Sequence, residues 1–322
     1  MKIFVTGGAG YVGSICVEEL LNAGHDVTVI DNLSEGHRQA IDERAQFIEG
    51  DLADRPLLFK SLRSIRPDAA MHFASNTLVS LSMSQPGKYL GDNVSNAVNL
   101  LDACVDAGVQ RFVFSSSCAI FGLPKAIPIT EDLPKDPINP YGESKWTVER
   151  VLAWYGKLYG LRYVCLRYFN AAGATLRFGE HHCEETHLIP NILKVALGQS
   201  PQVEIYGTQN PTPDGTCIRD FVHILDLAQG HMLALQSERP DVFNLGSGQG
   251  YSVREVIEAA RKVTGHPIPA VEKPPRPGDP PRLVADSTKI RKILGWKPRF
   301  DSLEPILESA WSWHQAHPNG YS

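Results

Sequence analysis

Short apolar runs alternate with amphipathic stretches along the first half of the chain. The runs are rich in β-branched residues, which is typical of buried strands, and the stretches between them repeat apolar residues at helical spacing. Strands are predicted at 2–6, 27–30, 46–49, 69–74, 111–114 and 163–167, and helices at 12–23, 55–65, 92–107 and 141–159. This alternation favours an α/β fold, with a doubly wound parallel sheet whose ligands lie at the carboxyl ends of its strands.

The pattern changes after residue 170, where proline and glycine become frequent and the strict alternation ends. Helices are predicted at 188–197, 252–263, 287–294 and 303–313, and a strand at 243–246. We therefore predict a larger part formed by 1–170 and a smaller α+β region formed by 171–322 at the C-terminal end. A portion of the second part, about 220–250, is expected to return to the main sheet.

Composition narrows the class of protein. The 322 residues carry a formal net charge of −5 at pH 7, which gives no electrostatic footprint for nucleic acid or for an anionic membrane surface. No run approaches the length of about 18 apolar residues typical of a membrane span, and the strand at 2–6 begins too early for a signal peptide. The six cysteines form no Cys-x-x-Cys pair, which suits reduced thiols. We expect a soluble cytoplasmic protein without a nucleic-acid or membrane partner.

A glycine-rich turn follows the first predicted strand and leads directly into a predicted helix. It contains Gly7, Gly10 and Gly13. Glycines let the backbone approach a pyrophosphate closely, and the helix N-terminus offers that group unpaired N–H groups and the positive end of the helix dipole. Strand, glycine turn and helix together predict a Rossmann-type unit in which these three glycines face a dinucleotide. A tight turn without a ligand is the alternative.

An acidic residue ends the second predicted strand. Asp31 lies about 20 residues after the glycine turn, where a carboxylate can accept from a ribose 2′-hydroxyl and would repel a 2′-phosphate. This favours NAD over NADP as the cofactor, although Arg38 stands close enough in sequence to keep NADP open. Asp51 and Leu52 follow the third strand, at the place where the adenine would lie.

The spacing of Tyr141 and Lys145 predicts a tyrosine that acts as a base next to a lysine. They are four residues apart behind a helix start at Asn139-Pro140, so both stand on one face of a helix. For a phenol to act as a base near pH 7, its pKa must fall by about three units, or about 4 kcal/mol, and an ammonium about 4 Å away supplies about that much. Burial acts in the opposite direction, so a second positive charge, such as an oxidised nicotinamide ring, would be needed. Ser117 could hydrogen-bond the same substrate hydroxyl. The alternative is a surface helix on which Tyr141 and Lys145 are merely neighbours.

The segment 181–187 is rich in side chains that can bind metals. It reads His181-His182-Cys183-Glu184-Glu185-Thr186-His187. These residues crowd one short loop and lack the spaced pairs of structural zinc sites. We therefore expect no metal and interpret the segment as a polar loop next to the substrate, with a metal site as the alternative.

Nearly the whole chain carries motifs of one family. In the first half they lie at 5–13, 31–33, 50–52, 72–74, 114–117, 140–145 and 167–170, and in the second half at 187–190, 214–223 and 276–279. With these stretches the chain resembles the extended short-chain dehydrogenase/reductase family, and within it the nucleotide-sugar 4-epimerases.

The resemblance implies a tightly bound NAD that is reduced and reoxidised in each turnover, and the interconversion of UDP-glucose and UDP-galactose through a transient 4-keto sugar. Tyr141 would take the proton from the sugar 4-hydroxyl, Lys145 would bind the nicotinamide ribose and lower the pKa of Tyr141, and Ser117 would orient the hydroxyl. The family's cofactor contacts carry over to Tyr11, Val12, Asp31, Asn32, Asp51, Leu52, Phe73, Ala74, Asn93, Lys145 and Phe169. Its substrate contacts carry over to Ser117, Tyr141, Asn170, Leu188, Tyr206, Arg219, Arg276 and Asp279. The implied partners are a UDP-sugar and a second copy of the chain in a homodimer.

The sequence also departs from relatives. Phe121 stands where many have Tyr, and 75–82 lacks the Lys or Gly-Glu pair that is frequent in them. Leu283 falls at the position that gates a sugar N-acetyl group and is smaller than Tyr, so an N-acetylhexosamine stays open as substrate, as do pentose and uronate forms. A nucleotide-sugar dehydratase is a further alternative, which is weakened because Cys118-Ala119 follow Ser117 where dehydratases carry acidic residues. An NAD-binding sensor without activity is the non-enzyme alternative.

Overall fold

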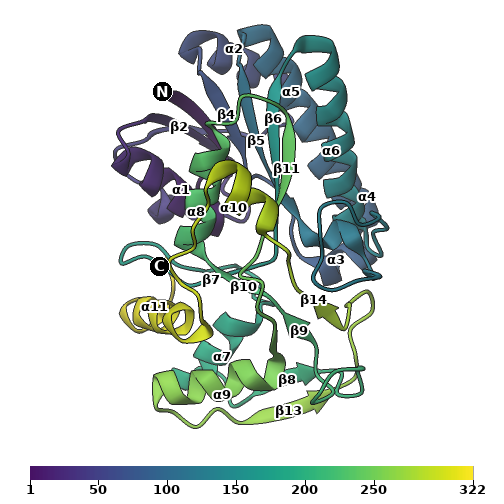
Figure 1. Ribbon diagram of the computed structural model, residues 1–322. Coiled ribbons are helices and arrows are strands. Elements are labelled where there is room, and N and C mark those ends of the chain that lie inside the picture. The colour runs from purple at the N-terminus through teal and green to yellow at the C-terminus, as the bar shows by residue number, and fades with distance from the viewer. Residues whose placement is uncertain (322) are drawn as a thin grey trace.

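A seven-stranded parallel sheet forms the centre of the larger part in a computed structural model, which describes residues 1–321 (Figure 1). The strands lie in the order β11-β6-β5-β4-β1-β2-β3, and each neighbouring pair is parallel. Their bounds are β1 (Lys2–Thr6), β2 (Asp26–Asp31), β3 (Gln46–Glu49), β4 (Ala69–His72), β5 (Arg111–Ser117), β6 (Arg162–Tyr168) and β11 (Asp241–Leu245). The predicted doubly wound parallel sheet is confirmed.

Helices cover both faces of this sheet. One face carries α1 (Tyr11–Asn22) and α8 (Ile224–Ala234), and the other carries α2 (Arg55–Ile65), α5 (Asn96–Ala107) and α6 (Pro140–Tyr159) (Figure 1). Successive side chains of β1 point to opposite faces, because Ile3 and Val5 belong to the first apolar layer and Phe4 to the second. Helices therefore shield both faces of the sheet from solvent, which explains why the strands are continuous apolar runs in the sequence.

The helix that carries Tyr141 and Lys145 begins where the sequence predicts. Asn139 caps α6 by accepting a hydrogen bond from the Gly142 N–H at 2.8 Å, and Pro140 occupies the first turn, where its missing N–H costs nothing. Gly160 ends the helix in a left-handed conformation with φ of 70°. This start places both residues in the first two turns, against the end of β5.

The later part of the chain builds a second, smaller layer below the sheet (Figure 1). There α7 (Leu188–Ala196), α9 (Val253–Thr264) and α11 (Leu303–Ala316) pack around one apolar cluster with β8 (Val203–Tyr206), which pairs with β13 (Ala270–Lys273). The short strand pairs are β7 (Asn170–Ala172) with β10 (Phe221–His223), and β9 (Ile218–Arg219) with both β12 (Tyr251–Ser252) and β14 (Arg282–Leu283). The remaining late helix is α10 (Thr288–Leu294). The strand predicted at 243–246 lies in β11 beside β6. The boundary near residue 170 stays a prediction.

Several elements are not predicted by the pattern. Besides α8 and the short strands, they are α3 (Val79–Ser84), α4 (Pro86–Leu90) and the short turns η1 (Arg38–Ala40) and η3 (Cys118–Phe121). The start of the helix predicted at 92–107 forms a π-helical turn, η2 (Gly91–Ser95), which leads into α5. Among residues 1–321, no helix combines the length and the apolar composition that crossing a membrane requires.

Candidate active site

The glycine turn between β1 and α1 packs against the end of β4 without room for side chains. A Cβ on Gly7, whose φ is +73°, would lie 2.4 Å from the Ala74 nitrogen, and a Cβ on Gly13 would lie 2.1 Å from the Gly7 oxygen. Gly10 precedes α1, and no side chain caps that helix end. The turn therefore presents bare backbone and a helix N-terminus, a combination that fits a pyrophosphate group.

Acidic and amide side chains gather at the carboxyl ends of β2 and β3. The buried Asp31 carboxylate accepts hydrogen bonds from the N–H groups of Ala9 at 3.0 Å and Leu33 at 2.9 Å. Burial raises the pKa of Asp31, and these two hydrogen bonds lower it. Asn32 donates to Asp51 at 2.7 Å. Three predicted cofactor contacts thus lie together, and their role toward the adenosine end stays a prediction.

Arg38, whose charge could favour NADP by pairing with a 2′-phosphate, contacts the ring of Phe47 in the structure. Its guanidinium carbon lies 4.1 Å from the centroid of the Phe47 ring, where a cation interacts favourably with an aromatic face.

One cavity of about 850 Å³ is lined by both parts of the chain. It contains every predicted substrate contact, namely Ser117, Tyr141, Asn170, Leu188, Tyr206, Arg219, Arg276 and Asp279. Of the predicted cofactor contacts it contains Gly7, Gly10, Tyr11, Val12, Gly13, Phe73 and Phe169. The others, Asp31, Asn32, Asp51, Leu52, Ala74, Asn93 and Lys145, do not line it. All of these contacts stay predictions.

Ser117, Tyr141 and Lys145 meet where β5 ends and α6 begins. Tyr141 and Lys145 are buried, and the Lys145 ammonium lies 5.7 Å from the centroid of the Tyr141 ring. Lys145 donates a hydrogen bond to the Ser115 carbonyl at 3.0 Å, and the Ser117 hydroxyl accepts from the Ala119 N–H at 3.2 Å. The structure therefore assembles the predicted trio, with Lys145 beneath the cavity wall.

Burial dominates the electrostatics of this trio. Burial raises the pKa of Tyr141 to about 12, although a hydrogen bond with Ser117 acts to lower it. Burial lowers the pKa of Lys145 to about 7. Burial thus acts against ionisation of the phenol, as expected, and the lowering of the pKa of Tyr141 by Lys145 together with an oxidised nicotinamide stays a prediction.

Asn93 is fully occupied within the protein. Its side-chain oxygen accepts from the Asn76 N–H at 2.8 Å, and its amide nitrogen donates to the Asn76 carbonyl at 3.1 Å and to the Ser144 hydroxyl at 2.9 Å. Asn93 therefore ties the segment after β4 to helix α6.

Two guanidinium groups are held at the cavity wall. Arg219 forms an ion pair with Asp279 and donates to the Ile218 carbonyl at 2.9 Å. The Arg276 guanidinium lies 3.8 Å from the centroid of the Tyr206 ring. A planar fork of donors suits a diphosphate, so this wall is chemically matched to the diphosphate of a nucleotide sugar.

The residues that depart from the family pattern lie in different surroundings in the structure. Phe121 is only 1% exposed and lies away from the cavity, with the Arg167 guanidinium 5.5 Å from its ring centroid. Seven residues of the segment 75–82 line the cavity, as does Leu283. The segment and Leu283 can therefore influence specificity, whereas Phe121 supports the core.

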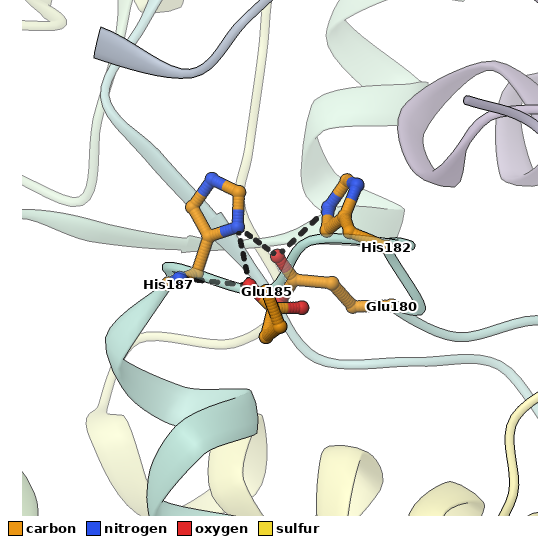
Figure 2. A group of neighbouring side chains, drawn as sticks. All are labelled: Glu180, His182, Glu185 and His187. Carbon is orange, nitrogen blue, oxygen red and sulfur yellow. Dashed lines mark hydrogen bonds and ion pairs between the residues drawn. The ribbon is translucent and has the colours of Figure 1, made fainter. Parts of the chain in front are cut away.

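Sequence reasoning missed some cavity residues. Lys88 lines the cavity from α4, a helix too short to give a periodic signal. Glu180, His182, Glu185 and His187 also line it and cluster together (Figure 2). Their residue types are those of metal ligands, but their spacing along the sequence argued against a metal site.

Comparison with known proteins agrees with this geometry. Residues 3–246 match the NAD dependent epimerase/dehydratase family. The chain is 50% identical to a UDP-glucose 4-epimerase of Lactobacillus helveticus, with 100% of this chain and 99% of that protein covered. It superposes with a TM-score of 0.97 on a crystal structure of a UDP-glucose 4-epimerase, 46% identical, with 100% of both chains covered. A UDP-glucose 4-epimerase from Bifidobacterium longum, in complex with NAD+ and UDP, gives a TM-score of 0.95 at 36% identity, with 99% of this chain and 100% of that chain covered. The predicted family is thus confirmed, and the chain belongs to the NAD dependent epimerase/dehydratase family.

Proposed function

We propose that this protein is a nucleotide-sugar 4-epimerase that interconverts UDP-glucose and UDP-galactose. One observation carries the proposal: Ser117 and Tyr141 line the same cavity as the glycine turn, Arg219 and Arg276, and the Lys145 ammonium lies 5.7 Å from the centroid of the Tyr141 ring behind the cavity wall. The identity of 50% to a UDP-glucose 4-epimerase over the full length supports the same reaction.

The cofactor is NAD, in keeping with the family. The glycine turn would hold its pyrophosphate, and Asp31, Asn32 and Asp51 would surround its adenosine. When bound, NAD supplies the acceptor and donor of a hydride at sugar carbon 4, together with the positive charge of its oxidised ring.

The chain's own residues move the proton. Tyr141 takes it from the sugar 4-hydroxyl, Ser117 holds that hydroxyl in line, and the oxidised sugar is a ketone at carbon 4. Arg219 and Arg276 keep the diphosphate in place while the keto sugar turns its other face toward the cofactor. Tyr141 then returns the proton to the oxygen, and the configuration at carbon 4 is inverted.

The identity of the sugar depends on the cavity wall. Leu283 lines the cavity and is paired in register with Arg219. A leucine leaves more room there than a tyrosine, which keeps UDP-N-acetylhexosamines as alternative substrates.

We further propose that the protein is a cytoplasmic homodimer. Trp154, Leu158 and Tyr159 are large exposed apolar side chains on α6, and a second copy would cover them. The six cysteines are free thiols and five of them are buried, which suits a reducing compartment.

The test is incubation of the purified protein with UDP-glucose and, separately, with other UDP-sugars, without added NAD. We expect UDP-galactose to form until equilibrium is reached, as resolved by chromatography. Tyr141→Phe should lower the rate by about 10²–10⁴-fold, whereas Tyr159→Phe, on the exposed end of the same helix, should not. A 4-keto-6-deoxy product would instead establish a dehydratase. Absence of turnover with every UDP-sugar, or full activity of Tyr141→Phe, would reject the proposed reaction.

A further inference from the structure

Four metal-binding side chains converge in the loop between β7 and α7 (Figure 2). The Glu180 Oε1 atom lies 3.3 Å from His182 Nε2 and 3.1 Å from His187 Nδ1, and Glu185 Oε1 lies 2.8 Å from the same His187 nitrogen. One donor atom from each residue lies within 4.8 Å of the other three.

Two carboxylates share one imidazole nitrogen in this arrangement. An imidazole nitrogen carries at most one hydrogen, yet carboxylate oxygens of both Glu180 and Glu185 face His187 Nδ1. The same Glu180 oxygen also faces His182. Two carboxylates that converge at this distance repel each other unless a positive charge lies between them.

Burial makes that repulsion more costly. Glu180 is 7% exposed and the Glu185 side chain only 2%. Buried charges in proteins are paired or coordinate metals. Burial lowers the pKa of His187, but Glu180 and Glu185 raise it to about 9, so a protonated His187 supplies positive charge when no metal is bound. A divalent cation would replace that proton, balance both carboxylates and use all four donors.

We propose that Glu180, His182, Glu185 and His187 bind a divalent transition-metal ion, and that Zn²⁺ suits them best. Zn²⁺ takes imidazole nitrogen and carboxylate oxygen in tetrahedral sites with bonds of about 2.0–2.2 Å, which sets ligand atoms about 3.3 Å apart. The three distances given above are 2.8–3.3 Å and the other pairs of donor atoms lie within 4.8 Å, so the glutamate side chains would have to rotate for all four atoms to reach one ion. Mg²⁺ and Ca²⁺ prefer sites built wholly from oxygen.

The loop selects these four side chains from a richer set. His187 directly precedes α7, and its N–H donates to Glu185 Oε1 at 2.7 Å, which fixes both residues locally. The adjacent His181 turns away and stacks on His37 with ring centroids 4.5 Å apart. Cys183 and Glu184 are exposed. The linear spacing therefore gives a poor guide to which residues can share an ion.

The ion would fix one wall of the substrate cavity. All four side chains line it, and so does Leu188, the first residue of α7. The role assigned is thus positional, because the site would join the loop to the start of α7. Occupancy can be measured without turnover, so the inference stands apart from the proposed reaction.

The experiment uses the full-length protein with its bound NAD. After removal of metals with a chelator and dialysis, Zn²⁺ is added and bound zinc per chain is measured by elemental analysis, with affinity from competition against a chromogenic chelator. We expect one zinc per chain and a rise of the melting temperature with Zn²⁺. His182→Ala and Glu180→Gln should each weaken binding by about tenfold or more. The control variants His181→Ala and Glu184→Gln, which change neighbours outside the cluster, should bind as the wild type does.

The inference would be overturned by the absence of stoichiometric binding at micromolar free Zn²⁺, or by equal affinity in the wild type and both ligand variants. Co²⁺ provides an independent probe, because coordination by thiolate adds a charge-transfer band that nitrogen and oxygen ligands lack. A band that disappears in Cys183→Ser would place the ion elsewhere and reject the site. If His182→Ala does not fold, Glu180→Gln and Glu185→Gln, which preserve side-chain size, carry the comparison. A protein that turns over UDP-sugars but fails to bind Zn²⁺ would reject this inference and leave the proposed reaction standing.

Discussion

The ammonium of Lys145 lies 5.7 Å from the centre of the Tyr141 ring and donates its hydrogen bond to the carbonyl of Ser115. Both groups are desolvated, so the pKa of Lys145 falls to about 7 while that of Tyr141 rises to about 12. Near neutral pH the phenol therefore keeps its proton, and burial disfavours the charged form of Lys145. The protein's own residues leave Tyr141 a weak acid, and its action as a base depends on further positive charge in the cavity.

Lys145→Met should lower the catalytic activity without lowering the stability of the fold at pH 7. The variant removes a buried cation, so we expect epimerase turnover to fall by about 10² or more while the free energy of unfolding at pH 7 is kept or increased. The folded pKa of about 7 lies below the reference value of 10.5, so the unfolded chain binds more protons between these values. The contribution of Lys145 to stability therefore improves from pH 7 toward pH 10.5.

Urea unfolding of both proteins at pH 7 and pH 9 checks this sign. The advantage of Lys145→Met should be larger at pH 7, and an advantage that grows with pH would contradict the burial argument.

Substitutions in the glycine turn should separate folding from cofactor binding. In Gly13→Ala the new Cβ would lie 2.1 Å from the Gly7 oxygen, and we expect a loss of about 1–3 kcal/mol. In Gly10→Ala the nearest atom is 3.5 Å away, an ordinary contact, so the protein should fold normally but retain less NAD. Gly87→Ala, with open space around it, is the matched control. Urea unfolding and the nucleotide content of the purified proteins give the two readouts. Equal stability of the Gly13 and Gly10 variants would contradict the steric argument.

A buried ion pair behind the site should be expensive to break. Glu149 accepts hydrogen bonds from Arg167 at 2.6 Å and from the Ser116 hydroxyl at 2.5 Å, and the side chains of the pair are each 3% exposed. Glu149→Gln leaves the Arg167 charge uncompensated, so we expect a loss of about 3–5 kcal/mol in urea unfolding.

The exposed Glu238, which pairs with Arg111 and Arg162, supplies the comparison. Glu238→Gln should cost less than about 1 kcal/mol. Similar losses in the two variants would show that the burial of the Glu149 pair has no energetic consequence.

Acid should destabilise the fold through buried histidines. His231 lies 2.8 Å from the Leu227 carbonyl and 3.0 Å from the Ser115 hydroxyl, and burial lowers its pKa to about 4 although the bond to Leu227 raises it. Because the unfolded chain binds more protons between pH 4 and the ordinary value of 6.5, stability is lost as pH falls through this window. His72 and His223, with pKa values of about 3 and 4, act in the same direction. His231→Gln should lose less stability than the wild type between pH 7 and pH 5 in urea unfolding, and parallel losses would count against this assignment.

The exposed end of α6 should govern association. If a second copy covers Trp154, Leu158 and Tyr159, then Leu158→Asp should shift the protein from dimer to monomer in light scattering coupled to size exclusion. Leu176→Asp is the matched control, because Leu176 is 97% exposed elsewhere in the chain. A dimer that survives Leu158→Asp would exclude this surface.

The main sheet was predictable because its strands are buried on both faces and stand out as apolar runs. The helix α8 was not, since its buried residues include Asp226 and His231 and leave no single apolar stripe. Their polar atoms find partners far away in sequence: Asp226 accepts from the N–H groups of Arg299 and Phe300, and His231 lies beside Ser115. The local pattern of apolar residues contains no information about such distant partners.

The candidate site divides in the same way. Motifs predicted the meeting of Ser117, Tyr141 and Lys145, because the end of a parallel strand and the start of the next helix meet at the same sheet edge. They could not predict how far burial would separate the two pKa values, which depends on the whole surroundings. The cluster around His187 could not be predicted from the sequence for a related reason, because the path of an irregular loop decides which side chains meet.

The strand β11 completes the sheet beside β6, although its residues 241–245 come long after those of β6. On the ribosome, β6 must wait for this late segment before it is paired on both sides. A premature stop before residue 241 would leave the seven-residue strand β6, with its apolar run 164–166, as the edge strand in place of β11, and exposed apolar edges pair readily with other copies. Truncation of this protein is therefore expected to yield aggregates rather than a smaller working enzyme.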